Sequence, residues 1–306
     1  GTGTGNGVSN TVYALHALGS DLYVGGAFVQ AGGASANRIA RWNGAAWSSL
    51  DSSGGNGVLD GFVYAISSIG LDLYVGGTFS QVAGAAAARI ARWDGAAWYS
   101  MTPLAGMVSV NSIATMGGDL YMGGVFSQPG GAPASNIARW DGMAWSSLGT
   151  GGGNGVNDSV NALATVDTTI YAGGSFIRAG GAIANHVARW NGASWSSLGA
   201  GTGNGLDKSV DALAVVGNDL YVGGLFDQAG GMVTPRVARW DGGSWNTVGT
   251  GINNFPNERV RALAAVGGDL YAGGNFITAG GVQVNRIARW DGATWGRVGT
   301  GTGSSI

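Results

Sequence analysis

The stretch YVGGAFVQAGGASANRIARWNGAAWSSL, residues 23–50, decides the fold because its parts return along the whole chain. It holds two Gly-Gly pairs, an Ala-Arg-Trp triplet and a second tryptophan five residues after the first. The first tryptophans of these pairs are Trp42, Trp93, Trp140, Trp190, Trp240 and Trp290, and their partners are Trp47, Trp98, Trp145, Trp195, Trp245 and Trp295. Successive pairs are 51, 47, 50, 50 and 50 residues apart and use all 12 tryptophans. The stretch is therefore one of six repeats.

Each repeat predicts four short strands that alternate with turns. In the first repeat these strands are 12–18, 21–28, 37–42 and 46–50. Gly19-Ser20 joins the first two strands and Asn43-Gly44 joins the last two, and such residues tolerate the positive φ of tight hairpins. No segment has a helical period. Four antiparallel strands in six repeats predict an all-β, six-bladed β-propeller.

The repeat boundaries predict one β-propeller domain over residues 1–306. The blades are expected approximately at 8–54, 59–105, 106–152, 156–202, 206–252 and 256–302. The chain begins and ends within the loop that links one blade to the next, so all four strands of each blade should be contiguous in sequence. Blades 1 and 6 would then meet by side-chain packing, without strand exchange.

The repeat resembles the kelch repeat. The resemblance rests on Tyr23-Val24-Gly25-Gly26 at the end of a strand, on the turn at Asn43 and on the following Trp47, and it covers all six repeats. The inserted AGGASAN (31–37) and the Ala-Arg-Trp triplet make it more similar to Gly-rich, kelch-like proteins of bacterial cell surfaces. The resemblance implies a propeller and a binding role, and it carries over no catalytic residue. The copper chemistry of galactose oxidase, a kelch-type enzyme, is excluded because the chain has no cysteine and two scattered histidines.

Composition limits the partners. Charged residues are 10% of the chain, against a usual ~25%, and the net charge is −2 without any basic run. We therefore expect neither nucleic acid nor an anionic membrane surface as partner. No apolar run approaches the ~18 residues of a membrane span. The weakly charged surface favours a secreted or cell-surface protein, and the absence of cysteine is compatible with the outside of a bacterial cell. The start at Gly1 suggests processing or excision from a longer chain.

The second residue of the first strand is the best candidate for ligand binding. It differs from repeat to repeat, while valine precedes it and alanine or serine follows it: Tyr13, Tyr64, Asn111, Asn161, Asp211 and Arg261. Consecutive strands alternate in direction, so these residues should ring the pore mouth on the face that carries the long loops. Loops on a rigid scaffold commonly carry function. Asp211 and Arg261 could also pair with each other.

The repeated tryptophans and arginines have structural explanations. Burial of large rings is a major stabilising term, which favours tryptophan packing between blades over sugar platforms. Six arginines could form an anion ring, but a buried ion pair with the aspartate before Leu-Tyr is favoured. These arginines are Arg41, Arg92, Arg139, Arg189, Arg239 and Arg289, and the aspartates are Asp21, Asp72, Asp119, Asp219 and Asp269. The fourth repeat has Thr169 there, with Asp167 as a possible substitute.

Little else in the chain predicts chemistry. The Gly-rich linking loops lack the following helix that a nucleotide loop needs. The turn GGNGVN (152–157) leaves a Ca²⁺ site open as a minor alternative, and otherwise no metal or cofactor is expected. Glu258 is the only glutamate, and His16 and His186 are each expected to be structural or solvated. No catalytic residue is predicted.

The sequence thus predicts a non-enzymatic extracellular interaction or structural module. Its partners would be other proteins or copies of itself, as in a surface assembly or filament. A lectin-like binder that uses the long-loop face is the first alternative, and a propeller hydrolase or lyase is the second.

Overall fold

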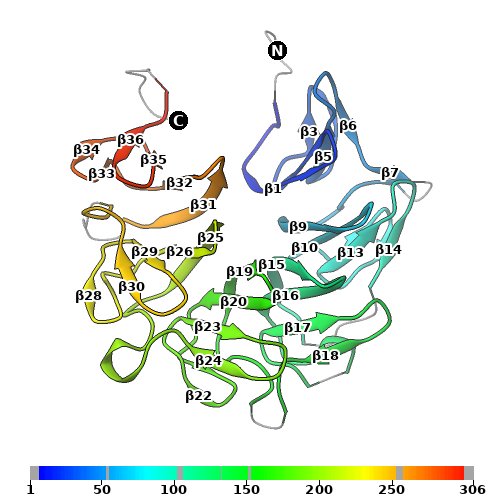
Figure 1. The fold of residues 1–306 in the computed structure, drawn as a ribbon. Coiled ribbons are helices and arrows are strands. Elements are labelled where there is room, and N and C mark those ends of the chain that lie inside the picture. The colour runs from blue at the N-terminus through cyan, green and yellow to red at the C-terminus, as the bar shows by residue number, and fades with distance from the viewer. Residues whose placement is uncertain are drawn as a thin grey trace. The chain divides into compact units, whose positions relative to one another are not determined.

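The structure is a computed structural model that describes residues 7–52, 55–101, 106–131, 133–150, 153–252 and 258–299. The chain divides into two compact units, Gly1–Ser147 and Leu148–Ile306. Each unit contains three four-stranded antiparallel sheets, the blades (Figure 1). The predicted blade ends at 54, 105, 152 and 302, and the predicted start at 256, lie outside the described residues.

The first unit contains blades 1 to 3. Blade 1 is β1 (Val12–Leu18), β2 (Asp21–Gly26), β5 (Ile39–Trp42) and β6 (Trp47–Ser49). Blade 2 is β9 (Val63–Ile69), β10 (Asp72–Gly77), β13 (Ile90–Trp93) and β14 (Trp98–Ser100). Blade 3 is β15 (Ser109–Met116), β16 (Asp119–Val125), β17 (Ile137–Trp140) and β18 (Trp145–Ser147).

The second unit contains blades 4 to 6. Blade 4 is β19 (Val160–Val166), β20 (Thr169–Gly174), β23 (Val187–Trp190) and β24 (Trp195–Ser197). Blade 5 is β25 (Val210–Val216), β26 (Asp219–Gly224), β29 (Val237–Trp240) and β30 (Trp245–Thr247). Blade 6 is β31 (Val260–Val266), β32 (Asp269–Gly274), β35 (Ile287–Trp290) and β36 (Trp295–Arg297). Six blades of contiguous strands confirm the fold class of a six-bladed β-propeller.

The loop between the second and third strands of a blade, the middle loop, forms a small hairpin in five blades. These hairpins are β3 (Gln30–Ala31) with β4 (Ala34–Ser35), β11 (Gln81–Val82) with β12 (Ala85–Ala86), β21 (Arg178–Ala179) with β22 (Ala182–Ile183), β27 (Gln228–Ala229) with β28 (Met232–Val233), and β33 (Thr278–Ala279) with β34 (Val282–Gln283). In blade 3 the 3-10 turn η1 (Pro129–Gly131) stands in this place. A further short pair, β7 (Asp51–Ser52) with β8 (Gly55–Asn56), lies in the loop that links blades 1 and 2.

The loop that precedes each blade, the linking loop, lies against the middle loop of that blade. Single β-bridges join the two loops at Val8 and Ala31, Val58 and Val82, Val156 and Ala179, Leu206 and Ala229, and Ile252 and Ala279. The prediction that the two long loops share one face is therefore confirmed for these blades. Their backbone groups bond to each other, so the loops are braced parts of the scaffold.

Each glycine of the Gly-Gly pair at the end of the second strand lies very close to another part of the structure. A Cβ on Gly25 would lie 2.4 Å from Cγ1 of Val63, the first residue of the first strand in the next blade. The same approach, at 2.4 to 2.5 Å, joins Gly76 to Val110, Gly173 to Val210 and Gly223 to Val260. A Cβ on Gly26 would lie 2.1 Å from the carbonyl oxygen of Thr11. The equivalent gap is 1.9 to 2.3 Å at Gly77, Gly124, Gly174, Gly224 and Gly274. Glycine alone fits both places, because it has no Cβ.

The tryptophans pack within and between blades, as predicted. The two rings of each pair face each other across the third and fourth strands, with centroids 5.1 to 5.5 Å apart. The second tryptophan also reaches the preceding blade. Its Nε1 donates a hydrogen bond to the main-chain carbonyl that follows the fourth strand there: Trp98 to Leu50 (3.0 Å), Trp245 to Leu198 (3.0 Å) and Trp295 to Val248 (3.0 Å).

The repeated arginines pair with the predicted aspartates in five blades. The pairs are Arg41 with Asp21, Arg92 with Asp72, Arg139 with Asp119, Arg239 with Asp219 and Arg289 with Asp269, at 2.6 to 3.2 Å. In blade 4 the Nε of Arg189 donates to Ser196 Oγ (3.1 Å) rather than pairing with Asp167. The prediction of buried pairs is wrong, because the five arginine side chains are 36 to 46% exposed. These are surface ion pairs, which contribute at most about 1 kcal/mol each.

Candidate functional site

Each of the six predicted site residues is the extra residue of a β-bulge. In blade 1, Val12 pairs with Gly26 and Ala14 pairs with Gly25, so Tyr13 has no partner on β2. The same shift of register leaves out Tyr64, Asn111, Asn161, Asp211 and Arg261. A bulge residue lies outside the ladder of paired residues, and bulges often re-aim a side chain near functional sites. Pairing with the second strand therefore does not fix which side chain stands at this position.

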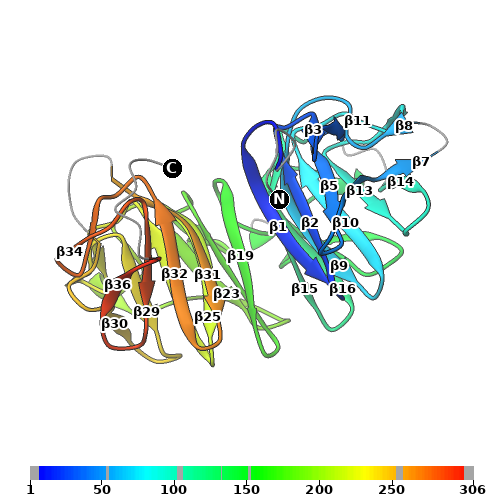
Figure 2. The ribbon, with the colours of Figure 1, turned by 90° about the horizontal axis from the view of Figure 1, so that it is seen from above.

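In the first unit, the bulges bring aromatic rings together. The first strands β1 and β9 of blades 1 and 2 lie side by side (Figure 2). The ring of Tyr13 is edge-on to the ring of Tyr64, with centroids 5.2 Å apart. Phe62, which precedes β9, lies 6.1 Å from Tyr13 and 6.2 Å from Tyr64. We call Tyr13, Phe62 and Tyr64 the aromatic cluster. Tyr13 is 49% exposed and Phe62 is 40% exposed, so the cluster is a surface feature.

These rings stand outside the repeat. Six of the nine tyrosines and six of the eight phenylalanines occupy repeated positions: Tyr23, Tyr74, Tyr121, Tyr171, Tyr221 and Tyr271, and Phe28, Phe79, Phe126, Phe176, Phe226 and Phe276. Five remain, namely Tyr13, Phe62, Tyr64, Tyr99 and Phe255. Three of these five meet in the cluster. Phe255 lies outside the described residues. The variation between repeats predicted the two tyrosines but not Phe62.

In the second unit, two bulge residues form hydrogen bonds with the next blade. Nδ2 of Asn161 donates to the carbonyl oxygen of Val210 at 2.8 Å. Asp211 accepts two hydrogen bonds from the guanidinium of Arg259, from Nε to Oδ2 and from Nη2 to Oδ1, both at 2.5 Å. The pairing of Asp211 with Arg261 is therefore wrong. Arg261 is exposed, and its charge acts on Asp211 without a direct bond.

The same two positions are in contact in both units, through aromatic rings in the first unit and through an ion pair in the second. The bulge residue of one blade touches the residue two places before the bulge of the next blade, as Tyr13 touches Phe62 and Asp211 binds Arg259. Sequence reasoning missed Arg259 because the register that sets this contact depends on the bulge. Burial raises the pKa of Asp211, and the hydrogen bond and charge of Arg259 oppose that effect. Asn111 occupies the same bulge in β15 and is half-buried.

The sequence analysis also missed the residue that precedes the third strand. It has a positive φ of 61 to 67° in all six blades, although it is never glycine: Arg38, Arg89, Asn136, His186, Arg236 and Arg286. The arginine that several repeats carry directly before Ile-Ala-Arg-Trp or Val-Ala-Arg-Trp could have indicated this position from the sequence. Arg38 shows its role, because its guanidinium donates to the carbonyl oxygens of Gly61, Val58 and Leu59 in the linking loop of the next blade.

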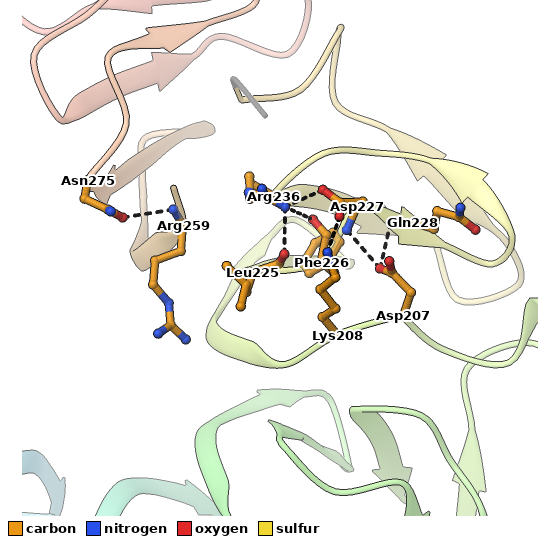
Figure 3. A network of polar contacts seen from close by, with 9 residues as sticks. All are labelled: Asp207, Lys208, Leu225, Phe226, Asp227, Gln228, Arg236, Arg259 and Asn275. Atoms are coloured by element: carbon orange, nitrogen blue, oxygen red, sulfur yellow. Dashed lines mark hydrogen bonds and ion pairs between the residues drawn. The ribbon is translucent and has the colours of Figure 1, made fainter. Parts of the chain in front are cut away.

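Arg236 is the centre of a polar network in blade 5 (Figure 3). Its Nη1 donates to the carbonyl oxygens of Leu225 (2.7 Å) and Phe226 (3.1 Å), and it pairs with Asp227, which also binds Lys208. Asp207 Oδ1 accepts from the backbone N–H of Asp227 and of Gln228, at 2.9 and 2.8 Å. These bonds fix the linking loop to the middle loop. The network therefore stabilises the scaffold.

The two histidines belong to different units, His16 to the first and His186 to the second. Nε2 of His16 is 2.9 Å from Ser68 Oγ of the next blade, and burial lowers its pKa. His186 takes the positive-φ position of blade 4, and burial lowers its pKa as well. Both rings should thus be neutral at pH 7.

No metal-binding or membrane-spanning element stands out in the part of the chain that the structure describes. Within it, no three histidine, cysteine, aspartate or glutamate side chains gather as a metal site would require. Its helical segments are three-residue 3-10 turns, too short to cross a membrane. The turn considered for Ca²⁺ at 152–157 lies partly outside the described residues.

Comparison with known proteins places the fold. No protein-family model matches the chain, and no curated protein matches its sequence. The solved structures that resemble it include two of the extracellular domain of BT4673 from B. thetaiotaomicron, a putative hybrid two component system in one and a putative one component system in the other. The TM-scores are 0.60 and 0.59, at 14% and 15% sequence identity, over 98% and 96% of this chain. The shared feature is the fold. The chain spans about a third of those proteins, 34% and 33% of their length.

Proposed function

We propose that the chain is a non-enzymatic interaction module of a kelch-like kind that acts outside the cell. The blades form a rigid scaffold, and the bulge residues of the first strands supply the side chains that select a partner. The extracellular domains that share its fold are compatible with this location. A secreted or cell-surface bacterial protein fits the uncharged, cysteine-free composition.

One observation carries the proposal. In every blade, the residue that the strand register skips is the one whose chemistry changes along the chain, from tyrosine through asparagine to aspartate and arginine. The residues around it repeat because each fills a fixed place, such as the glycine that receives the valine of the next blade. The long loops, in contrast, are bonded to each other through their backbone groups.

The exposed bulge residues are the ones expected to bind. Tyr13 and Arg261 are exposed and Tyr64 is half-buried, whereas Asn161 and Asp211 already hold partners on the next blade. Partners can be other proteins, copies of the chain in a surface assembly, or glycans. The aromatic cluster is the observation that favours glycans.

Variants of the exposed bulge residues test the proposal. Tyr13→Ala, Tyr64→Ala and Arg261→Ala should keep the circular dichroism spectrum and the unfolding midpoint of the parent. Binding would be measured against a panel of purified glycans and extracellular proteins, and self-association by sedimentation velocity. At least one of the three changes should abolish an interaction that Leu71→Ala preserves, since Leu71 lies in the turn at the other end of blade 2 and is 82% exposed. Interactions that survive all three changes would contradict the proposal.

A further inference from the structure

We propose that the aromatic cluster of Tyr13, Phe62 and Tyr64 binds the apolar face of a neutral sugar ring. This inference rests on the proposed function and assigns a ligand class to part of the same site. It starts from the three rings that the repeat does not require and that nevertheless converge.

The scaffold does not need an aromatic cluster at this place. The two positions that Tyr13 and Phe62 occupy are filled in blades 5 and 6 by the ion pair of Asp211 and Arg259. Blade 4 has an asparagine at its bulge, which donates to a backbone carbonyl of blade 5. Neighbouring blades can therefore be joined here without aromatic residues. A contiguous patch of exposed apolar side chains, unlike a single exposed one, commonly marks a binding site.

The charged side chains nearest the cluster already hold hydrogen-bond partners within the scaffold. Asp60, two residues before Phe62, accepts hydrogen bonds from the backbone N–H of Ser80 (2.8 Å) and of Gln81 (2.9 Å), and one from Ser80 Oγ (2.6 Å). The guanidinium of Arg38 donates to the carbonyl oxygen of Gly61, directly before Phe62, at 2.6 Å. A charged ligand would find no free counter-charge among these groups, so a neutral ligand is favoured.

The size of the cluster favours a single ring over a protein surface. Three partly exposed aromatic side chains present about 200–300 Å² in total, since a whole aromatic side chain offers about 150–250 Å². A stable protein interface buries about 800 Å² on each partner. A sugar ring matches the smaller area, because its C–H face can stack on an aromatic ring while its hydroxyl groups reach the phenol groups of Tyr13 and Tyr64.

The test compares tyrosines inside and outside the cluster. The full chain would be probed on an array of neutral and acidic oligosaccharides, and each hit would be titrated by calorimetry. Tyr13→Ala and Tyr64→Ala should weaken binding of a neutral oligosaccharide at least tenfold, while Tyr64→Phe should weaken it less because it keeps the ring. The matched control is Tyr99→Ala. Tyr99 is also outside the repeat and is 46% exposed, but it lies on β14 beneath Arg92, and its loss should change affinity less than twofold.

Other outcomes separate this inference from the proposed function. Binding only to acidic oligosaccharides, to tetramethylammonium or to purified proteins, with the same dependence on Tyr13 and Tyr64, would overturn the sugar assignment and leave the interaction module standing. Neutral-sugar binding that Tyr99→Ala removes and that Tyr13→Ala preserves would also overturn it. If no array ligand, protein or ammonium ion depends on a bulge residue, both proposals fail.

Discussion

At the scale of single residues, many glycines stand where a neighbouring backbone or side chain leaves no room for a Cβ atom. Gly173 has an ordinary strand conformation, so its need for glycine comes from Val210 of the next blade rather than from φ. Gly180 has φ +58° and also faces Trp195, so it is required for both reasons. The Gly-rich composition is thus explained by particular contacts that return in each repeat.

The first prediction concerns the contact between Gly173 and Val210. A Cβ on Gly173 would lie 2.4 Å from Val210 Cγ1, so Gly173→Ala should lower the free energy of unfolding by about 1–3 kcal/mol. Gly243→Ala is the matched control, because the nearest atom to its Cβ would be Asp241 Oδ1 at 3.8 Å and its φ is not positive. Urea titration followed by circular dichroism measures both. Equal stability of the two variants would contradict the packing argument.

The second prediction concerns Ala83, which has φ +47° in the middle loop of blade 2. The equivalent residues of blades 1 and 4, Gly32 and Gly180, have φ +60° and +58°. A side chain in this region costs about 1–2 kcal/mol, part of which is returned because alanine restricts the unfolded chain. Ala83→Gly should therefore raise the free energy of unfolding by up to about 1 kcal/mol. Gly180→Ala should lower it, and a stability loss from Ala83→Gly would refute the strain argument.

At the scale of the strand and the turn, the sequence predicted what repeats and missed what depends on register. The strands, the tight turns and the tryptophan pairs followed from local pattern, and the structure confirms them. The bulge could not be predicted, because it arises where the carbonyl oxygen of Thr11 fits against Gly26, a contact between strands. The pairing of Asp211 with Arg259 was missed for the same reason. The prediction that the arginine pairs are buried was wrong, because the arginine side chains are partly exposed to solvent.

The third prediction concerns the turn between the third and fourth strands. Asp291 Oδ1 accepts from the backbone N–H of Ala293 and of Thr294, and these bonds lower its pKa from 3.8. The pKa values of Asp94 and Asp141 are lowered in the same way. A lowered pKa in the folded state stabilises the fold above pH 3.8, and this contribution is lost as the pH falls through the folded-state value.

Replacing these carboxylates should therefore flatten the acid limb of the stability curve. Asparagine already makes the same bonds at Asn43, whose Oδ1 accepts from Ala45 and Ala46 N–H at 2.9 and 2.8 Å. The triple variant Asp94→Asn, Asp141→Asn, Asp291→Asn should match the parent in unfolding midpoint at pH 7 and lose less of it between pH 5 and pH 2. Parallel curves for the variant and the parent would show that the turns do not contribute.

The fourth prediction concerns the tryptophans. Trp245 is 6% exposed, and its Nε1 donates to Leu198 of the preceding blade. Trp245→Ala removes a large buried ring and should cost about 3–5 kcal/mol. Trp245→Phe should cost less, since it keeps a ring and loses the hydrogen bond. Trp42→Ala is the control, because Trp42 is only half-buried. Differential scanning calorimetry would show the order, and a larger effect at Trp42 would contradict the packing role.

At the scale of the whole molecule, six copies of one repeat supply the scaffold, and we propose that the departures from the repeat carry the function. The period of the tryptophans was enough to predict six contiguous blades. The candidate site was predictable only as a variable position, since its neighbours Phe62 and Arg259 are set by contacts between blades. Closure of the blades into a ring stays a prediction, and so does a common pore mouth for the six bulge residues.

The central claim is that the scaffold and the binding residues can be changed separately. The most direct test replaces Tyr13, Tyr64 and Arg261 together by asparagine, the residue already found at the bulges of blades 3 and 4. We expect this variant to unfold cooperatively at nearly the midpoint of the parent and to lose binding of the ligands of the parent. A variant that binds as well as the parent, or one that fails to fold, would contradict it.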